Sequence, residues 1–276
     1  MKDVDINNLA SVIVISYSNI KYLKENINSI LKQNYSPIEI IISDDCSNEF
    51  DEEFKKSLEL YIEENKKENI INYIVNKNKI NEGGVKNLNK AIRLSKGKYI
   101  IPLECDDCFY DSESVKNIVD FFKYNSQYLM AKSYEYSCDV NMNPISKERF
   151  PQWCIDLLNG DPLDLYLRLC KGNFISGSHL YYTREFIDKF GMYDEDYKQL
   201  ADHTKLLNIT RQGCKIGIID AITIYRRWGG ESRDFNGYNL DQEKKIQIKN
   251  ELNKDRKTMR EKEIIPYIDK IKSGRP

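Results

Sequence analysis

The sequence has no apolar run near the roughly 20 residues that a membrane-spanning helix needs. Its 42 basic and 43 acidic residues nearly cancel, to a formal net charge of −1. No global positive field is therefore present to recruit nucleic acid through its phosphates. The first residues, Met-Lys-Asp-Val-Asp, carry acids where a secretory signal peptide has a basic start and an apolar stretch. We therefore expect a soluble globular protein of the cytoplasm, and neither a dedicated DNA-binding protein nor a membrane-spanning one.

Cysteine and glycine patterns exclude further classes. The seven cysteines are an odd number and are scattered, which does not suggest a disulfide framework. Cys105 and Cys108 stand three apart, but no second pair of Cys or His follows at zinc-binding spacing. Residues 81–84 (NEGG) could present backbone N–H groups to a phosphate at a helix start. They match neither GxGxxG nor GxxxxGK(S/T), so a nicotinamide-binding site or a P-loop is disfavoured.

What the sequence does have is a regular alternation of strands and helices in its first 105 residues. Short β-branched runs predict buried strands, and apolar residues at helical spacing predict helices between them. The expected strands are residues 11–16, 38–43, 70–75 and 99–103, and the expected helices are 21–33, 51–67 and 84–94. This order predicts right-handed crossovers and a mostly parallel sheet with helices on both faces.

The pattern is looser in the second half. It predicts, in order, a helix, a strand, a polar loop, a strand, a helix and a strand, at residues 112–124, 128–134, 138–151, 174–182, 200–212 and 215–225. The last forty residues alternate charges on a helical pattern. We expect them to form a solvated pair of helices, with contact to a membrane surface as the weaker interpretation.

Two acidic pairs directly follow predicted strands, namely Asp44-Asp45 and Asp106-Asp107. Since ligands of parallel sheets bind at the carboxyl ends of the strands, both pairs should project into one crevice. Carboxylates crowded in this way favour a hard divalent cation, and Asp106 beside Glu104 or Asp107 suits a site for a metal and a diphosphate. The alternative is that each pair caps a helix or a turn. The residues alone leave both interpretations open.

Four stretches stand in order along residues 9–227: SVIVISYSN, SPIEIIISDDCS, NEGGVKNLNKAIRLSKGKYIIPLECDD and, less sharply, YDEDYKQLADHTKLLNITRQGCKIGIIDAITIYRR. In this order and spacing they resemble the inverting, nucleotide-sugar-dependent family 2 glycosyltransferases. The resemblance implies the GT-A fold, an α/β architecture with a mostly parallel nucleotide-binding sheet flanked by helices. We expect a nucleotide-sugar-binding half at residues 1–110 and an acceptor and catalytic half at 111–237. Residues 238–276 would be a C-terminal helical extension on the acceptor side.

The resemblance also implies roles for residues that match the family motifs. Tyr17 would stack near the base of the nucleotide, and Asp44 and Asp45 would hydrogen-bond the uracil or the ribose. The triplet Glu104-Cys105-Asp106 is the counterpart of the family's Asp-X-Asp. Asp106 would hold the Mn²⁺ or Mg²⁺ that bridges the donor diphosphate. Glu104, with its extra methylene, would still reach a ribose hydroxyl or would displace the first ligand.

Asp202 matches the catalytic acid of the family's Glu-Asp motif. As general base it would deprotonate the acceptor hydroxyl, and its alternative is an ordinary helix N-cap. Arg226 would steady the leaving diphosphate, although Arg227 is equally placed by sequence. His203 could supply a metal ligand or tune Asp202, but an exposed histidine at a helix start is the simpler expectation.

The sequence departs from the family pattern at three positions. Glu104 stands where Asp is common, Ala201 replaces the Glu before the catalytic Asp, and Leu88 stands where many members carry Arg. The first two motivate an alternative: a catalytically silent relative that binds nucleotide or glycan. A sugar nucleotidyltransferase is disfavoured, because residues 17–21 (YSNIK) offer one lysine and no glycine to hold a triphosphate.

Our hypothesis is a bacterial-type hexosyltransferase that moves one sugar from a nucleotide-sugar donor, with UDP as the expected nucleotide. The acceptor would be a growing surface glycan, such as lipopolysaccharide or capsule, or its lipid-linked precursor. The site would then lie at the cytoplasmic face of the inner membrane, with peripheral membrane contact. Trp153, Trp228 and the loop at 141–151 would shape the acceptor cleft, since aromatic rings stack on sugars; both tryptophans could equally be core residues.

Overall fold

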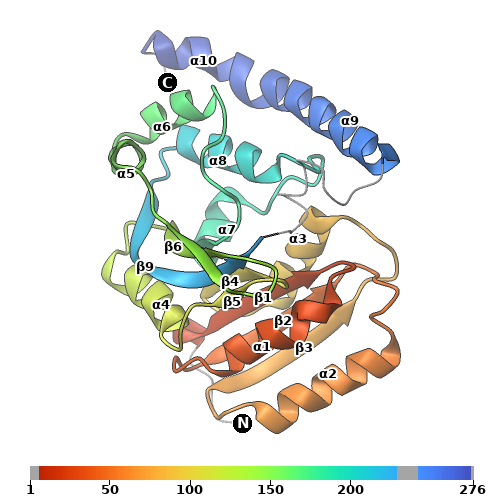
Figure 1. The fold of residues 1–276 in the computed structure, drawn as a ribbon. Coiled ribbons are helices and arrows are strands. Elements are labelled where there is room, and N and C mark those ends of the chain that lie inside the picture. Colours follow the sequence, from red (N-terminus) through yellow and green to blue (C-terminus); the bar gives the residue numbers. More distant parts are fainter. Residues whose placement is uncertain (1–5, 229–241, 275–276) are drawn as a thin grey trace.

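The computed structural model describes residues 6–228 and 242–274. Within these residues nine strands form one sheet in the order β3-β2-β1-β4-β8-β6-β9-β5, and β7 pairs with β6. Helices cover the sheet on both sides (Figure 1), which confirms the α/β architecture expected from the sequence. The expected boundary between residues 237 and 238 lies outside the described residues.

The first half is the alternating unit that the sequence predicts. Its elements are η1 (Ile6–Asn8), β1 (Ala10–Ser16), η2 (Ile20–Tyr22), α1 (Leu23–Leu31), β2 (Ile38–Asp44), α2 (Glu52–Asn65), β3 (Ile70–Lys77), α3 (Gly84–Leu94) and β4 (Tyr99–Glu104). β1 pairs in parallel with β2 and β4, and β2 pairs in parallel with β3. All four predicted strands and three predicted helices are present, with ends that differ by a few residues.

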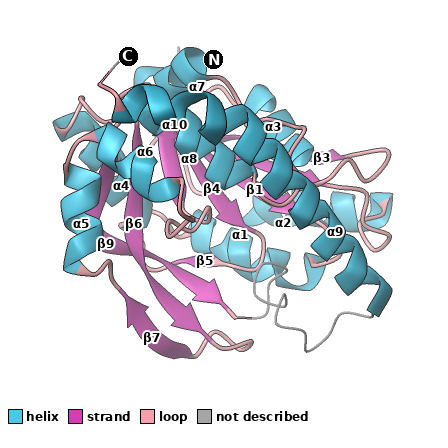
Figure 2. Ribbon diagram, turned by 90° about the horizontal axis from the view of Figure 1, so that it is seen from above, coloured by secondary structure: helices cyan, strands magenta, loops and turns pink. Residues whose placement is uncertain are grey.

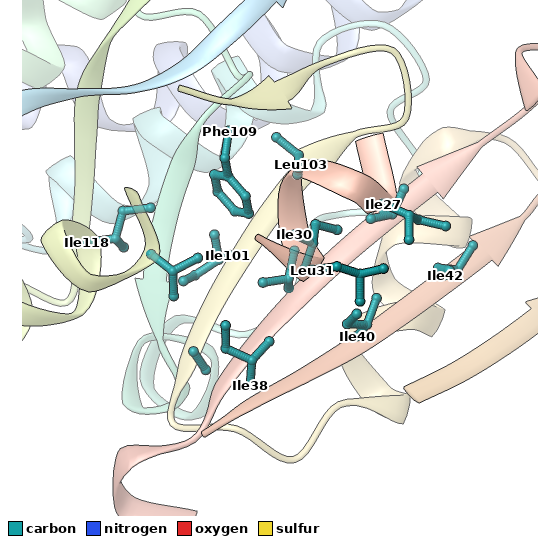
Figure 3. Packing of buried hydrophobic residues seen from close by; sticks show 14 of the residues in the cluster. Ile27, Ile30, Leu31, Ile38, Ile40, Ile42, Ile101, Leu103, Phe109 and Ile118 are labelled. Carbon is teal, nitrogen blue, oxygen red and sulfur yellow. The ribbon is translucent and has the colours of Figure 1, made fainter. Parts of the chain in front are cut away.

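Side-chain alternation along the buried strands builds two separate cores. Val12 and Val14 of β1 pack in the cluster that includes α1 and α2, whereas Ile13 packs in the cluster that includes α3. Successive strand residues point to opposite faces of a sheet, so an uninterrupted apolar strand must be covered on both sides. Figure 3 shows Ile27 and Ile30 of α1 above the isoleucines of β2.

The second half is more mixed. Its elements are β5 (Cys108–Phe109), α4 (Ser114–Tyr124), β6 (Met130–Cys138), β7 (Pro144–Glu148), α5 (Gln152–Asn159), α6 (Pro162–Leu169), β8 (Leu180–Thr183), α7 (Arg184–Phe190), α8 (Ala201–Arg211) and β9 (Ile216–Arg227). β6 and β9 are parallel, but β8 runs antiparallel to both β4 and β6. The parallel order predicted from the first half therefore continues only in part.

Two predicted elements of this half are wrong. The expected loop at 138–151 contains the strand β7. All side chains of β7 are exposed, so its sequence lacks the alternation of apolar and polar residues that predicts a strand. β7 forms a hairpin with β6 that projects from the sheet (Figure 2). The expected strand at 174–182 begins only at Leu180. The backbone before it is irregular, and His179 has a left-handed φ of 62°.

The C-terminal residues form α9 (Gln242–Met259), a π-helical turn η4 (Arg260–Ile264) and α10 (Ile265–Lys272). The expected helix pair is present, but it is packed on one face rather than fully solvated. Asp255 and Met259 are buried, and the Arg211 guanidinium of α8 lies 3.5 Å from the ring centre of Tyr267. Figures 1 and 2 show α9 running past α8. Among the described helices, none combines the length and apolarity needed to cross a membrane.

Candidate active site

The parallel strands bring the predicted donor-site residues to one edge of the sheet. Ser16 of β1 is in register with Asp44 of β2, and Ile15 is in register with Glu104 of β4. The side chain that follows β1, Tyr17, is 42% exposed at this edge. The structure thus places the acidic pairs in one region, as the strand pattern predicts.

Asp44 and Asp45 are both buried and both organise loops of this edge. Asp44 accepts hydrogen bonds from the Ser16 hydroxyl at 2.8 Å and from the backbone N–H and hydroxyl of Ser47 at 2.7 and 2.6 Å. Asp45 accepts from the Asn78 amide and from the backbone N–H groups of Glu82 and Gly83, at 2.7 to 2.9 Å. Their predicted contact with uracil or ribose stays a prediction, and both acids have a structural role.

Glu104, Asp106 and Asp107 form an acidic triad, in which one carboxylate oxygen from each residue lies within 4.8 Å of the others. Burial and then the neighbouring Asp107 raise the pKa of Glu104 to about 7 and that of Asp106 to about 6. Asn19 donates to Asp106 at 3.4 Å. Oxygen ligands that repel one another in a desolvated place fit a hard divalent cation such as Mg²⁺ or Mn²⁺. The triad therefore fits the predicted metal site, with Asp107 as a third candidate ligand.

Glu135 of β6, His179 directly before β8 and Arg226 of β9 form a buried polar network beside the triad. His179 places one ring nitrogen 3.0 Å from Glu135 and the other 3.1 Å from Asp107, and Arg226 donates to Glu135 at 3.0 Å. Burial alone would raise the pKa of Glu135, but these two partners and Lys132 hold it well below its usual range. The predicted diphosphate-binding residue Arg226 thus lies near the triad and is paired with Glu135.

Arg227 has a different position from its neighbour. Its backbone N–H donates to Asp107 at 2.8 Å, and its Nε donates to the Asp106 carbonyl at 2.9 Å. Its guanidinium also pairs with Glu25 and lies 4.1 Å from the ring centre of Tyr22. Arg227 therefore supports the acidic turn from the side of β9.

A cavity of about 210 Å³ is lined by Glu104 of the triad and by His179, Lys198, Gln199 and Asp202, among others. Asp202 is the second residue of α8, and burial raises its pKa while nearby Lys132 opposes the rise. It is not the helix N-cap, because Leu200 holds that position without a side-chain cap. The structure thus brings the predicted base and the first triad residue to the same cavity.

Two basic residues near Asp202, Lys132 and His203, are buried. Lys132 of β6 donates to the backbone carbonyls of Ser176 and Ser178, at 3.2 and 2.6 Å, and so holds the segment beside Asp202. Burial lowers the pKa of Lys132 to about 8. The expectation of an exposed His203 is wrong, because its side chain is buried with Nε2 2.8 Å from the Leu169 carbonyl. His203 is therefore directed to the core rather than to the cavity.

Sequence reasoning missed the roles of His179, Lys132 and Glu135, which depend on how β6, β8 and β9 meet. The rarity of histidine, two in the chain, was the one signal that pointed to His179. The two predicted acceptor-side tryptophans are half exposed, Trp153 at 50% and Trp228 at 48%. Trp153 packs on Phe174 with ring centres 5.0 Å apart. Neither tryptophan is a fully buried core residue.

Comparisons with known sequences agree with this geometry. A family model described as glycosyl transferase family 2 matches residues 11–191. An uncharacterized glycosyltransferase of Haemophilus influenzae is 26% identical over 271 residues, which cover 95% of this chain and 75% of the relative. The putative colanic acid biosynthesis glycosyl transferase WcaA of Escherichia coli K12 is 31% identical over 152 residues, or 53% of this chain and half of the relative.

Solved structures show the same fold. TarS residues 1–349 of Staphylococcus aureus, in complex with UDP-GlcNAc, align with a TM-score of 0.61 at 18% identity, over 87% of this chain and 64% of that one. A mannosyltransferase of Pyrobaculum calidifontis, in complex with GDP-Man and Mn²⁺, aligns with a TM-score of 0.59 at 14% identity, over 84% of this chain and 62% of that one. At these identities the likeness establishes the fold alone, which is GT-A as expected.

Proposed function

Because this chain belongs to glycosyl transferase family 2, we propose that it moves one sugar from a nucleotide-sugar donor to a hydroxyl of a glycan or lipid-linked glycan, with inversion. The observation that carries this proposal is a single cavity lined by both Glu104 of the acidic triad and Asp202. A transferase needs the leaving diphosphate and the attacking hydroxyl on opposite sides of one sugar. With Glu104 and Asp202 lining one cavity, the triad would hold the diphosphate and Asp202 would face the acceptor hydroxyl.

The donor nucleotide would lie across the ends of β1 and β2. Tyr17 is exposed there and would stack on the base. A carboxylate has about four lone-pair sites, and Asp44 and Asp45 each accept three hydrogen bonds within the protein. Asp44 and Asp45 would use a remaining lone pair for a base N–H or a ribose hydroxyl. UDP is the proposed nucleotide, and the solved complexes of TarS with UDP and UDP-GlcNAc support that choice.

Asp106, with Glu104 and Asp107 beside it, would hold the divalent cation. Bound there, Mn²⁺ or Mg²⁺ would neutralise the triad and the charge that develops on the leaving diphosphate. Arg226 lies on the same side, where its charge lowers the pKa of Glu104 and Asp106. It would add to the stabilisation of the diphosphate.

Asp202 would act as general base on the acceptor hydroxyl. A base works best when its pKa lies close to the working pH, and burial moves Asp202 in that direction. The deprotonated oxygen would attack the anomeric carbon from the face opposite the diphosphate, which inverts the configuration. Residues 1–110 would thus bind the donor and residues 111–237 the acceptor.

The acceptor would be a surface polysaccharide or its lipid-linked precursor, built at the cytoplasmic face of the inner membrane with peripheral membrane contact. The likeness to a putative colanic acid glycosyltransferase supports this class. Half-exposed Trp153 and Trp228 would offer aromatic faces to acceptor sugars.

Gly177 gives a test of the base that does not alter any charge. A Cβ at this position would lie 1.5 Å from Oδ2 of Asp202, so Gly177→Ala must displace the carboxylate. A misplacement of this size can lower turnover by about 10²-fold. We expect that loss in nucleotide release, with melting temperature close to wild type. Gly160→Ala is the control, since this glycine is exposed after α5, does not line the cavity, and its Cβ would meet only the Asp156 and Leu157 carbonyl oxygens, at 3.1 and 3.5 Å. Wild-type turnover in Gly177→Ala would show that the position of Asp202 does not matter.

The proposal is tested by release of the nucleoside diphosphate from a panel of UDP- and GDP-sugars, with Mn²⁺ or with EDTA, in the presence of mixed oligosaccharide acceptors. We expect release from sugars of one nucleotide only, and only with the metal. NMR of the product would show the inverted anomeric configuration. Nucleotide binding without release from any sugar would instead support the catalytically silent relative, which the Glu104 and Ala201 departures motivate.

A further inference from the structure

Asp255 of the C-terminal helix α9 accepts hydrogen bonds from the backbone segment that leads into α8. Oδ2 of Asp255 accepts hydrogen bonds from the N–H groups of Lys198, Gln199 and Leu200, at 2.9, 2.7 and 3.1 Å. Asp255 is 3% exposed although it lies on an otherwise polar helix. An acid is rarely buried this far unless its charge is paired or hydrogen-bonded. Three converging backbone donors supply that compensation.

The segment that Asp255 holds is also a wall of the candidate active site. Lys198 and Gln199 line the same cavity as Asp202, which follows Leu200 by two residues. Leu200 is the N-cap of α8 and has no side-chain cap bond, so its position depends on contacts from outside the helix. Asp255 provides such a contact from 55 to 57 residues further along the chain.

A second residue of α9 reinforces the contact. Glu251, one helical turn before Asp255, receives hydrogen bonds from the side chains of Lys198 and Gln199, at 3.1 and 3.2 Å. These two contacts are more exposed and should be worth little. The buried bonds to Asp255 therefore carry most of the connection between α9 and the cavity wall.

We propose that Asp255 is a positioning residue of the transferase: it fixes residues 198–200 and thereby sets the place of Asp202 and the acceptor side of the cavity. This inference rests on the proposed function. It gives the C-terminal helix, which lies outside the matched residues 11–191, a part in catalysis. A helix that merely covered a hydrophobic face would leave turnover unchanged when Asp255 changes.

The structural half of the proposal is tested by backbone amide exchange in full-length Asp255→Asn, which keeps the shape and removes the charge. Hydrogen bonds to a charged acceptor are the stronger ones, so we expect exchange at residues 198–200 to rise by about tenfold. The amides of β1 and β4 should exchange as in the wild type. Unchanged exchange at residues 198–200 would overturn the proposal, whatever the activity.

The functional half uses UDP with Mn²⁺ as the binding probe and UDP release from UDP-N-acetylglucosamine as the turnover probe. In Asp255→Asn we expect the Kd of UDP to stay within about twofold and kcat to fall by about tenfold, because only the acceptor side moves. Asp255→Glu should recover part of the loss. Lys254→Ala, an exposed neighbour on α9, is the control and should behave as the wild type.

The exchange and kinetic experiments together distinguish failure of the positioning role from failure of the proposed function. Faster exchange at residues 198–200 with unchanged kcat would overturn the positioning role. Equal losses of UDP binding and kcat would also overturn it, since they indicate general unfolding. If the wild type itself releases no nucleotide from any sugar, the proposed function fails, and the exchange experiment still decides whether Asp255 holds the cavity wall.

Discussion

Asp202→Asn is expected to bind nucleotide as the wild type does and to lower the rate of transfer by about 10²- to 10⁴-fold, the usual contribution of a positioned general base. Asparagine has the same shape as aspartate but cannot take up the proton of an acceptor hydroxyl. The loss should appear in kcat rather than in the KM for the donor, because the interaction is made in the transition state. Single-turnover kinetics with the nucleotide sugar that the wild type uses would measure it.

The matched control for this variant is Asp188→Asn on α7, which changes an exposed aspartate in the same way. It should keep wild-type kinetics. Transfer at the wild-type rate in Asp202→Asn would mean that another group is the base. In that case the departure at Ala201, directly before Asp202, would mark a real difference from the family motif.

Asp106→Ala should abolish the metal-dependent part of nucleotide binding. A nucleotide present at about 100 times its Kd stabilises a protein by about 2.7 kcal/mol and so raises its melting temperature. In Asp106→Ala the metal-dependent part of that rise should be absent. Asp106 is chosen because it is the member of the triad that matches the second acid of the Asp-X-Asp motif. A wild-type nucleotide shift in this variant would contradict the metal site.

Asp106→Asn separates loss of the metal from loss of the fold. The folded-state pKa of Asp106 is raised from 3.8 to about 6 by burial and by Asp107. The folded state therefore binds this proton more tightly than the unfolded state, and stability falls as the pH rises from about 4 to about 6. The variant has no such proton, so without metal it should lose less stability than the wild type over this range. Urea unfolding at several pH values would measure the difference.

The donor edge of the site could be predicted because it depends on local patterns. Each of Asp44 and Asp106 comes at the end of a largely buried apolar strand, and parallel pairing then brings the strand ends together. The side chains of β1, β2 and β4 are mostly buried, which confirms the buried strands predicted at these positions. Asp202 was identified only through resemblance to a family motif, because nothing in the spacing of α8 distinguishes a base from a cap.

The remaining contacts depend on chain segments that are far apart in the sequence. His179 reaches Asp107 and Glu135 because β8 is inserted antiparallel between β4 and β6, a pairing without a sequence pattern of its own. Asp255 looks like any acid on a charged helix until its contacts to residues 198–200 are seen. Buried polar networks of this kind depend on tertiary structure, so the periodicity of residues along the sequence does not predict them.

The proposed function requires that the protein bind a nucleoside diphosphate through a divalent cation at the acidic triad. Thermal unfolding of the wild type with UDP, GDP, CDP and TDP, each with Mn²⁺ or with EDTA, tests it most directly. We predict a rise in melting temperature with one nucleotide, UDP, that disappears in EDTA. No rise with any of the four nucleotides, or an equal rise in EDTA, would contradict the claim.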